Sequence, residues 1–284
     1  MSYLLRRRTV CLGTLLSGLA LRAAKAQSRP LEIGVLPNLS ARVLLAQYEP
    51  MRAYLARVMD RPVQISTAPN WTTFHRRTVD FHYDIVVTAA NLARVAQIDF
   101  GFVPLVRCVP DIQGLLVVAK ERPMASVGDL RGRTLVLSNR QSLVSLRGMR
   151  WLAAARLRQG TDFKTMDAPT DDSTGNVVLR GDAVAAMLSG GEFRAIPEAI
   201  RGRLAIFEKF ADVPGFVVMA NPRRSADEIR RFVLHLERFA AGTDEGRAFF
   251  AASGFADLRP AEQALMQSLD SDVEATRQGL LRPG

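Results

Sequence analysis

The sequence predicts an α/β protein made of two lobes. Short apolar runs rich in β-branched residues alternate with segments of helical periodicity along the whole chain, a pattern typical of α/β proteins with largely parallel sheets. The alternation starts afresh after an apolar run at 113–119, and the run at 214–219 indicates a strand that returns to the first lobe. The length of 284 residues and the apolar fraction of 48% fit one large or two smaller domains.

The first 26 residues have the features of an export signal. Arginines at 6–8 precede an apolar stretch from Val10 to Leu21, and Ala24-Lys25-Ala26 supplies small residues at a cleavage site. The stretch is too short to cross a hydrocarbon core of about 30 Å. We therefore expect a signal peptide at 1–26, removed by either the Sec or the twin-arginine route, and a mature protein in the periplasm.

Composition and motifs exclude several classes of function. The signal contains five basic residues and no acidic one, so its removal halves the formal net charge of +10. No basic helix, RNA-binding aromatic pattern or zinc-finger spacing indicates a nucleic-acid partner. The three histidines have no cysteine or carboxylate at ligand spacing, so neither a metal ion nor a cofactor is expected. No serine elbow, Cys-His pair or HExxH motif occurs, which argues against an enzyme.

The first lobe begins with two strand and helix units. A strand at 31–36 ends in a loop at 37–40, and the helix that follows stops at Arg61-Pro62 before a strand at 63–65. The second unit has a helix from about Trp71, a strand at 84–87, a helix at 89–97 and a strand at 102–108. This first part of lobe 1 is expected to span 27–112.

The second lobe is expected to span 113–205. Its predicted elements are strands at 113–119, 134–137, 163–166 and 183–187, with helices at 142–157 and near 173–179. Lobe 1 is expected to resume over 206–284, where three helices start near Ser225, Asp244 and Pro260. Ser225 and Glu228 have the spacing of a capping box.

Several segments resemble PhnD-like periplasmic binding proteins for phosphate, phosphite and phosphonate. They are 33–37, 48–55, 61–63, 83–87 and, at the entry to the second lobe, 125–132. The resemblance runs from about Leu31 to about Met219 and implies the fold of a type 2 periplasmic binding protein, in which two lobes close on a ligand in the cleft between them.

The phosphonate site of that family is only partly matched. The family has a Ser-Thr-Ser cluster at a helix start, where hydroxyls and backbone N–H groups hold the oxyanion, and only Ser142 matches it here. Asn38 stands in the place of an aromatic residue, and Thr88-Ala89-Ala90 replaces a Gly-Pro pair. A His-Asp pair of the family falls near Asp171-Asp172.

The resemblance to an arsenite-binding branch of the family would explain Cys108, which is the single cysteine left after cleavage. A thiolate bonds to As(III), whereas largely uncharged arsenous acid needs no strong anion site. Such a protein would capture arsenite through Cys108, as the residue that binds the metalloid, and signal to the periplasmic domain of a membrane histidine kinase that controls arsenite oxidation. Cys108 ends the strand before the crossing into lobe 2, which is a place from which it can reach the cleft.

The other expected ligand contacts are Asn38, Thr88, Ser142 and Asp172, with Trp71 as a wall of the site. Each has an alternative role, since Asn38 and Thr88 fit a turn or a cap and Asp172 fits a helix cap. Cys108 has one as well, because a lone cysteine in a strand is ordinarily a small buried apolar residue. Two other functions stay open: a binding protein that delivers phosphonate, phosphate or another oxyanion to an ABC permease, and an enzyme with Cys108 as nucleophile.

Overall fold

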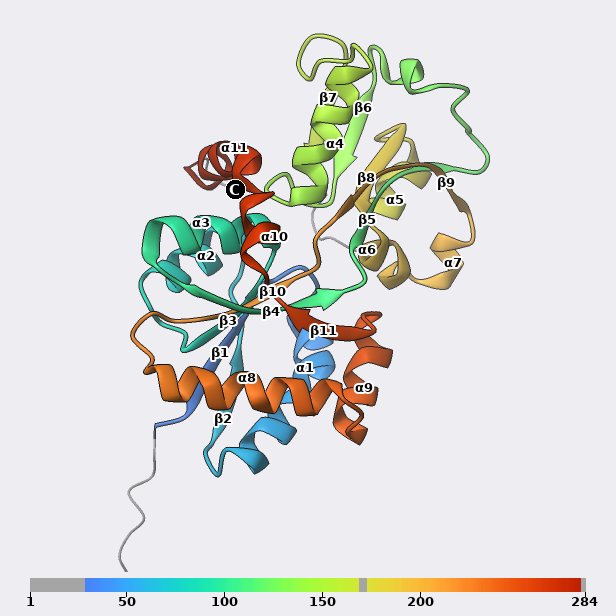
Figure 1. Ribbon diagram of the computed structural model, residues 1–284. Helices are drawn as coiled ribbons and strands as arrows, with labels where there is room; N and C mark the ends of the chain where they lie inside the picture. The colour runs from blue at the N-terminus through green and yellow to red at the C-terminus, as the bar shows by residue number, and fades with distance from the viewer. Residues whose placement is uncertain (1–28, 169–172, 282–284) are drawn as a thin grey trace, which may run out of the picture.

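The computed structural model describes residues 29–168 and 173–281 and has two α/β lobes (Figure 1). The signal peptide expected at 1–26 lies outside the described residues. Within them, no helix is both long and apolar enough to span a bilayer.

Lobe 1 is built on a six-stranded sheet with the order β11-β4-β10-β3-β1-β2. β1 is parallel to β2 and β3, whereas β10 runs antiparallel between β3 and β4, and β11 is antiparallel to β4. The strands are β1 (Leu31–Val35), β2 (Val63–Ser66), β3 (Ile85–Thr88), β4 (Val103–Val109), β10 (Val217–Ala220) and β11 (Asp257–Pro260).

Helices cover both faces of this sheet. Side chains of α1 (Ala41–Val58), α8 (Ala226–Ala240) and α9 (Asp244–Ser253) pack on one face. On the other face lie α2 (Trp71–Val79), α3 (Ala90–Phe100) and α10 (Gln263–Gln267). Because both faces are covered, β3 is buried at every position.

Lobe 2 has a five-stranded sheet with the order β7-β6-β8-β5-β9. β6 is parallel to β7 and β8, and β5 is antiparallel to β8 and β9. Its elements are β5 (Ile112–Ala119), η1 (Val127–Leu130), β6 (Thr134–Leu137), α4 (Leu143–Ala154), β7 (Lys164–Asp167), α5 (Thr174–Arg180), β8 (Ala185–Ser189), α6 (Gly190–Ala195), α7 (Glu198–Arg201) and β9 (Leu204–Val213).

Three features differ from the sequence-based expectations. Both sheets are mixed rather than largely parallel, because the strands next to the two crossings are antiparallel to their neighbours in the sheet. The segment 204–213 is β9, which pairs with β5 along its whole length, so the chain returns to lobe 1 at 214–216 and not at residue 206. After α9 the chain forms β11 and then α10 and α11 (Asp270–Leu281), where one helix was expected.

Ser225 begins α8 as the sequence predicts. Its hydroxyl accepts a hydrogen bond from the Glu228 backbone N–H, and the Glu228 carboxylate accepts one from the Ser225 N–H. The capping box is therefore confirmed.

The C-terminal helix α11 lies between the lobes. It packs against α3 of lobe 1 and against α4 of lobe 2 (Figure 1). Several hydrogen bonds cross between the lobes here: Gln141 donates to the hydroxyl of Thr72 at 2.9 Å and to the carbonyl of Gly279 at 3.0 Å, and the amide of Asn91 donates to the carbonyl of Gln141 at 3.1 Å. The lobes thus touch along the α4 side of the cleft.

Candidate functional site

A small cavity lies between the two lobes at the starts of several helices. Its volume is about 40 Å³, which is enough for a small anionic group or for a few water molecules. It is lined by Asn38, Trp71, Ala89, Ala90, Ile112, Ser142, Leu143, Val144, Ser189, Glu192, Val213, Pro214 and Phe216.

Three of the longer helices direct their N-termini to this cavity. Trp71, Ala90 and Leu143 are the first residues of α2, α3 and α4, and all three line it. The first N–H groups of a helix have no partner within the helix and carry a partial positive charge. Ala89, at the N-cap of α3, offers no side-chain acceptor for them. These helix ends can therefore donate hydrogen bonds to an oxyanion.

The two crossings between the lobes form the base of the cavity. Ile112 begins β5 on one crossing, and Val213, Pro214 and Phe216 lie on the other. The crossings are hydrogen-bonded to each other, because the backbone N–H of Cys108 donates to the carbonyl of Phe216 at 2.8 Å.

The structure brings three of the predicted site residues together around this cavity. Asn38 lies in the loop after β1, Trp71 at the start of α2, and Ser142 at the N-cap of α4. The indole of Trp71 donates to the carbonyl of Pro37 at 3.2 Å, which fixes the ring as a wall. The Ser142 hydroxyl accepts from the Ser145 N–H at 3.0 Å, so its oxygen is already engaged as a helix cap.

Thr88 and Asp172 do not join them. Thr88 ends β3 and is 2% exposed, and it is not part of the cavity wall, although the two residues after it are. Asp172 lies outside the described residues.

Cys108 is inside the core of lobe 1 and not in the cleft, which corrects the expectation that its sulfur reaches the ligand. It is 1% exposed and packs in the same apolar cluster as Tyr48 and Leu105. Burial raises the pKa of the thiol to about 12, despite the opposing effect of Arg107. A sealed, protonated thiol is a poor ligand for arsenic and a poor nucleophile.

Glu192 is a wall residue that the sequence reasoning missed. It is 6% exposed, and its carboxylate accepts hydrogen bonds from the Ser138 hydroxyl at 3.1 Å and from the Ser189 N–H. Burial raises the pKa of Glu192, and the hydrogen bonds from Ser189 and Ser138 oppose that rise. The signal for it was the Ser-x-x-Glu spacing from Ser189, directly after a buried strand.

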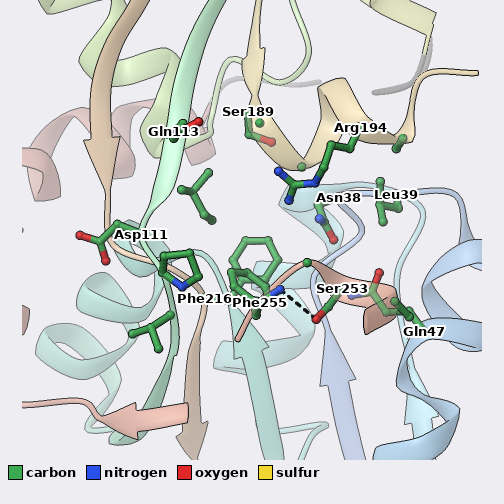
Figure 2. Close-up of a pocket in the computed structure, with 18 of the residues that line it drawn as sticks. Asn38, Leu39, Gln47, Asp111, Gln113, Ser189, Arg194, Phe216, Ser253 and Phe255 are labelled. Carbon is green, nitrogen blue, oxygen red and sulfur yellow. Dashed lines mark hydrogen bonds between the residues drawn. The ribbon is translucent and has the colours of Figure 1, made fainter. Parts of the chain in front are cut away.

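A larger cavity of about 990 Å³ opens beside the small one (Figure 2). The two share Asn38, Ile112, Ser189 and Phe216 in their walls. The charged residues that line the larger cavity are Arg107, Asp111, Arg194 and Asp212. Arg107 is paired with Asp111 at 2.6 Å, whereas Arg194 has no ion pair within the described part of the chain.

Neither cavity offers a metal centre. Within 29–168 and 173–281, no three His, Cys, Asp or Glu side chains are grouped closely enough to hold a metal ion.

The sequence matches the model of one protein family over residues 33–266. The family is described as "ABC transporter, phosphonate, periplasmic substrate-binding protein". No curated protein matches the sequence.

Solved structures of similar fold cover most of the chain. A binding protein component of an ABC phosphonate transporter from Pseudomonas aeruginosa has 13% identity and a TM-score of 0.77, covering 90% of this chain and 91% of that one. PhnD1 from Prochlorococcus marinus, in complex with methylphosphonate, has 13% identity and a TM-score of 0.75, covering 88% and 98%. XAC2383 from Xanthomonas citri, bound to ATP, has 20% identity and a TM-score of 0.70, covering 89% and 99%. At these identities the similarity shows a shared fold, that of type 2 periplasmic binding proteins.

Proposed function

Because this chain belongs to the family of periplasmic substrate-binding proteins of phosphonate ABC transporters, we propose that it binds a phosphonate or a related small oxyanion between its lobes and delivers it to an ABC permease. The family is one of binding proteins that act in the periplasm, so the function requires reversible capture and no catalysis.

The observation that carries this proposal is the small cavity at the N-termini of α2, α3 and α4. Among the described residues, its walls hold no lysine, arginine or histidine. An oxyanion would therefore be held by helix N–H groups and by the Asn38 amide, which are donors that act without a full positive charge. Because the cavity lies between the lobes, an oxyanion in it can be contacted by α2 and α3 of lobe 1 and by α4 of lobe 2.

The buried carboxyl of Glu192 is compatible with an anionic ligand only in its protonated form. A carboxylate beside the ligand would repel it, whereas a neutral carboxylic acid has a proton to donate. The raised pKa of Glu192 favours the neutral form.

Closure of the two lobes would allow the permease to distinguish the liganded protein from the unliganded one. A ligand that contacts both lobes binds the closed arrangement more tightly than the open one and so shifts the population toward it. The permease would then recognise the surface that closure creates.

Arsenite capture and signalling to a histidine kinase are not what we propose. Arsenite capture depends on an accessible thiolate, and kinase signalling was expected only as its consequence, whereas the thiol of Cys108 is 1% exposed with a pKa of about 12. The burial removes the reason for preferring that function over oxyanion transport, and it removes the proposed nucleophile of an enzyme as well.

Calorimetric titration of the exported protein tests the proposal. We expect methylphosphonate, phosphite or phosphate to bind to the wild-type protein with a stoichiometry of one, and arsenite to give no heat of binding. Arsenite binding with no response to any oxyanion would overturn the proposal.

An isosteric pair of variants locates the site. Asn38→Asp adds a negative charge to the cavity wall without changing its volume, and we expect it to weaken oxyanion binding by about tenfold or more, the size of a lost hydrogen bond to a charged group. Gln64→Glu is the matched control, because it makes the same amide-to-carboxylate change at an exposed position of β2 outside both cavities. Equal effects of the two substitutions would place the ligand elsewhere.

A further inference from the structure

The two adjoining cavities have unequal sizes and unequal charges. The small cavity has room only for the phosphonate group of a ligand, and no cationic side chain lines it in the part of the chain that the structure describes. The large cavity has room for an organic substituent and is lined by Arg194. Asn38, Ile112, Ser189 and Phe216 line both, so a ligand seated in the small cavity can extend into the large one between these side chains.

Arg194 is positioned to meet such a substituent. It follows the capping box of α6 by two residues, and its side chain extends from lobe 2 across the larger cavity toward Asn38 (Figure 2). Its Nη2 atom approaches Gly254 at the end of α9 in lobe 1, where a Cβ would lie 2.6 Å from that nitrogen. The Arg194 side chain thus reaches from lobe 2 to lobe 1, and no acidic residue in 29–168 or 173–281 forms an ion pair with it.

The other charged residues that line the larger cavity lie in or beside the two crossings between the lobes. Asp111 lies on the opposite side of the cavity from Arg194 and is already paired with Arg107 (Figure 2). Asp212 is exposed and lies opposite Gln113 in the pairing of β9 with β5. On the α6 side of the cavity, within the described residues, Arg194 is the charged group that lines the wall.

We propose that Arg194 forms a second anion subsite, and that the preferred ligands are phosphonates whose organic substituent carries a carboxylate. This proposal rests on the proposed function, since the phosphonate group occupies the small cavity. The planar guanidinium matches a carboxylate with two parallel hydrogen bonds, which gives both affinity and a preferred orientation. The end of α9 at Gly254 carries a partial negative charge, which favours the guanidinium in this position before the ligand arrives.

Phosphonoacetate and methylphosphonate form the probe pair, because they share the phosphonate group and differ in the carboxylate. We expect the wild-type protein to bind phosphonoacetate at least about tenfold more tightly, as for a charge-assisted hydrogen-bonded pair. Arg194→Gln should remove this preference and leave the affinity for methylphosphonate unchanged. Arg230→Gln is the control for net charge, because Arg230 is exposed on α8 and paired with Asp227, and it should retain the preference.

Charge reversal provides a second readout. Arg194→Glu should favour 2-aminoethylphosphonate over phosphonoacetate, the reverse of the wild-type order. If the wild-type protein binds methylphosphonate and phosphonoacetate equally, the second subsite is overturned while the proposed function stands. If it binds no phosphonate at all, both are overturned.

Discussion

The Nη2 atom of Arg147 lies 3.0 Å from the Oδ2 atom of Asp272, and this ion pair joins the two lobes. Arg147 belongs to α4 of lobe 2, and Asp272 belongs to the C-terminal helix α11, which packs on lobe 1. Arg150, one turn further along α4 in the direction of its C-terminus, contacts the other carboxylate oxygen. The Asp272 side chain is fully buried, so separating the lobes on this side would expose a carboxylate that is paired twice in this structure.

Asp272→Asn should loosen lobe closure. The substitution keeps the shape but removes the charge, and we expect it to lower the free energy of unfolding by about 2 kcal/mol, less than for a fully buried pair because both arginines are partly exposed. Ligand affinity should fall too, because the ligand binds the closed arrangement. Small-angle scattering of the unliganded protein should show a larger radius of gyration.

Glu274→Gln is the control for this prediction. Glu274 is at an exposed position of the same helix, so the substitution should change neither stability, ligand affinity nor the radius of gyration. If Asp272→Asn also leaves all three unchanged, this contact does not control closure.

Cys108 should not react while the protein is folded. Its thiol is buried and its pKa is raised to about 12, so both access and thiolate formation are blocked. We expect iodoacetamide to modify Cys108 only in denaturant. The rate of this modification should not exceed the rate at which the protein unfolds. Cys108→Ser should leave oxyanion affinity unchanged, although it places a hydroxyl in an apolar cluster and should cost stability. Rapid alkylation of the native protein, blocked by arsenite, would contradict this prediction and restore the arsenite hypothesis.

The burial of Cys108 shows a limit of the sequence pattern. Alternation along a strand predicts that neighbouring side chains point to opposite faces, but it does not say which face meets a cleft. β4 is sandwiched between β10 and β11 and its sheet is covered by helices on both sides, so either face leads into a core. The motif order predicted the two-lobed α/β fold, while the direction of one side chain depended on helices more than one hundred residues away in α8 and α9.

Strand β9 was missed for a related reason. Its exposed and buried positions do not alternate cleanly, because the register with β5 shifts twice along the ladder. A local apolar pattern is weak in such a strand, and the pairing partner alone identifies it. Asn38, Trp71 and Ser142 were predictable because each follows a strand at the edge where ligands of open α/β sheets bind.

The affinity for an oxyanion should depend on pH through Glu192. Burial raises the pKa of this carboxyl above 4.5. It is therefore neutral below the raised pKa and charged above it, so affinity should be highest at low pH and should fall as the pH rises through that value. Titrations at increasing pH above the ordinary pKa of a glutamate should show this fall for the wild-type protein.

Glu192→Gln isolates this contribution, because glutamine cannot ionise and keeps the spacing of a capping box. Measuring the same ligand on both proteins cancels the ligand's own titration, so the ratio of the two affinities should change with pH. Glu198→Gln, on the exposed side of α7 and paired with Arg201, should follow the wild-type protein. A constant ratio between the wild-type protein and Glu192→Gln would show that Glu192 does not titrate beside the ligand.

Two glycine substitutions should change stability in opposite directions. Gly215 lies on the second crossing, and a Cβ there would collide with the backbone carbonyl of Cys108, which cannot move without breaking the contact between the crossings. We expect Gly215→Ala to lower the free energy of unfolding by about 3 kcal/mol, at the upper end for overpacking.

Gly279 lies inside α11, where a Cβ would meet the Gln141 side chain at an ordinary van der Waals distance of 3.7 Å. Gly279→Ala should therefore raise the free energy of unfolding by about 0.5–1 kcal/mol, because alanine has the higher helix propensity. Chemical denaturation measures both, and a Gly215→Ala protein as stable as the wild type would mean that the crossings separate more freely than their packing indicates.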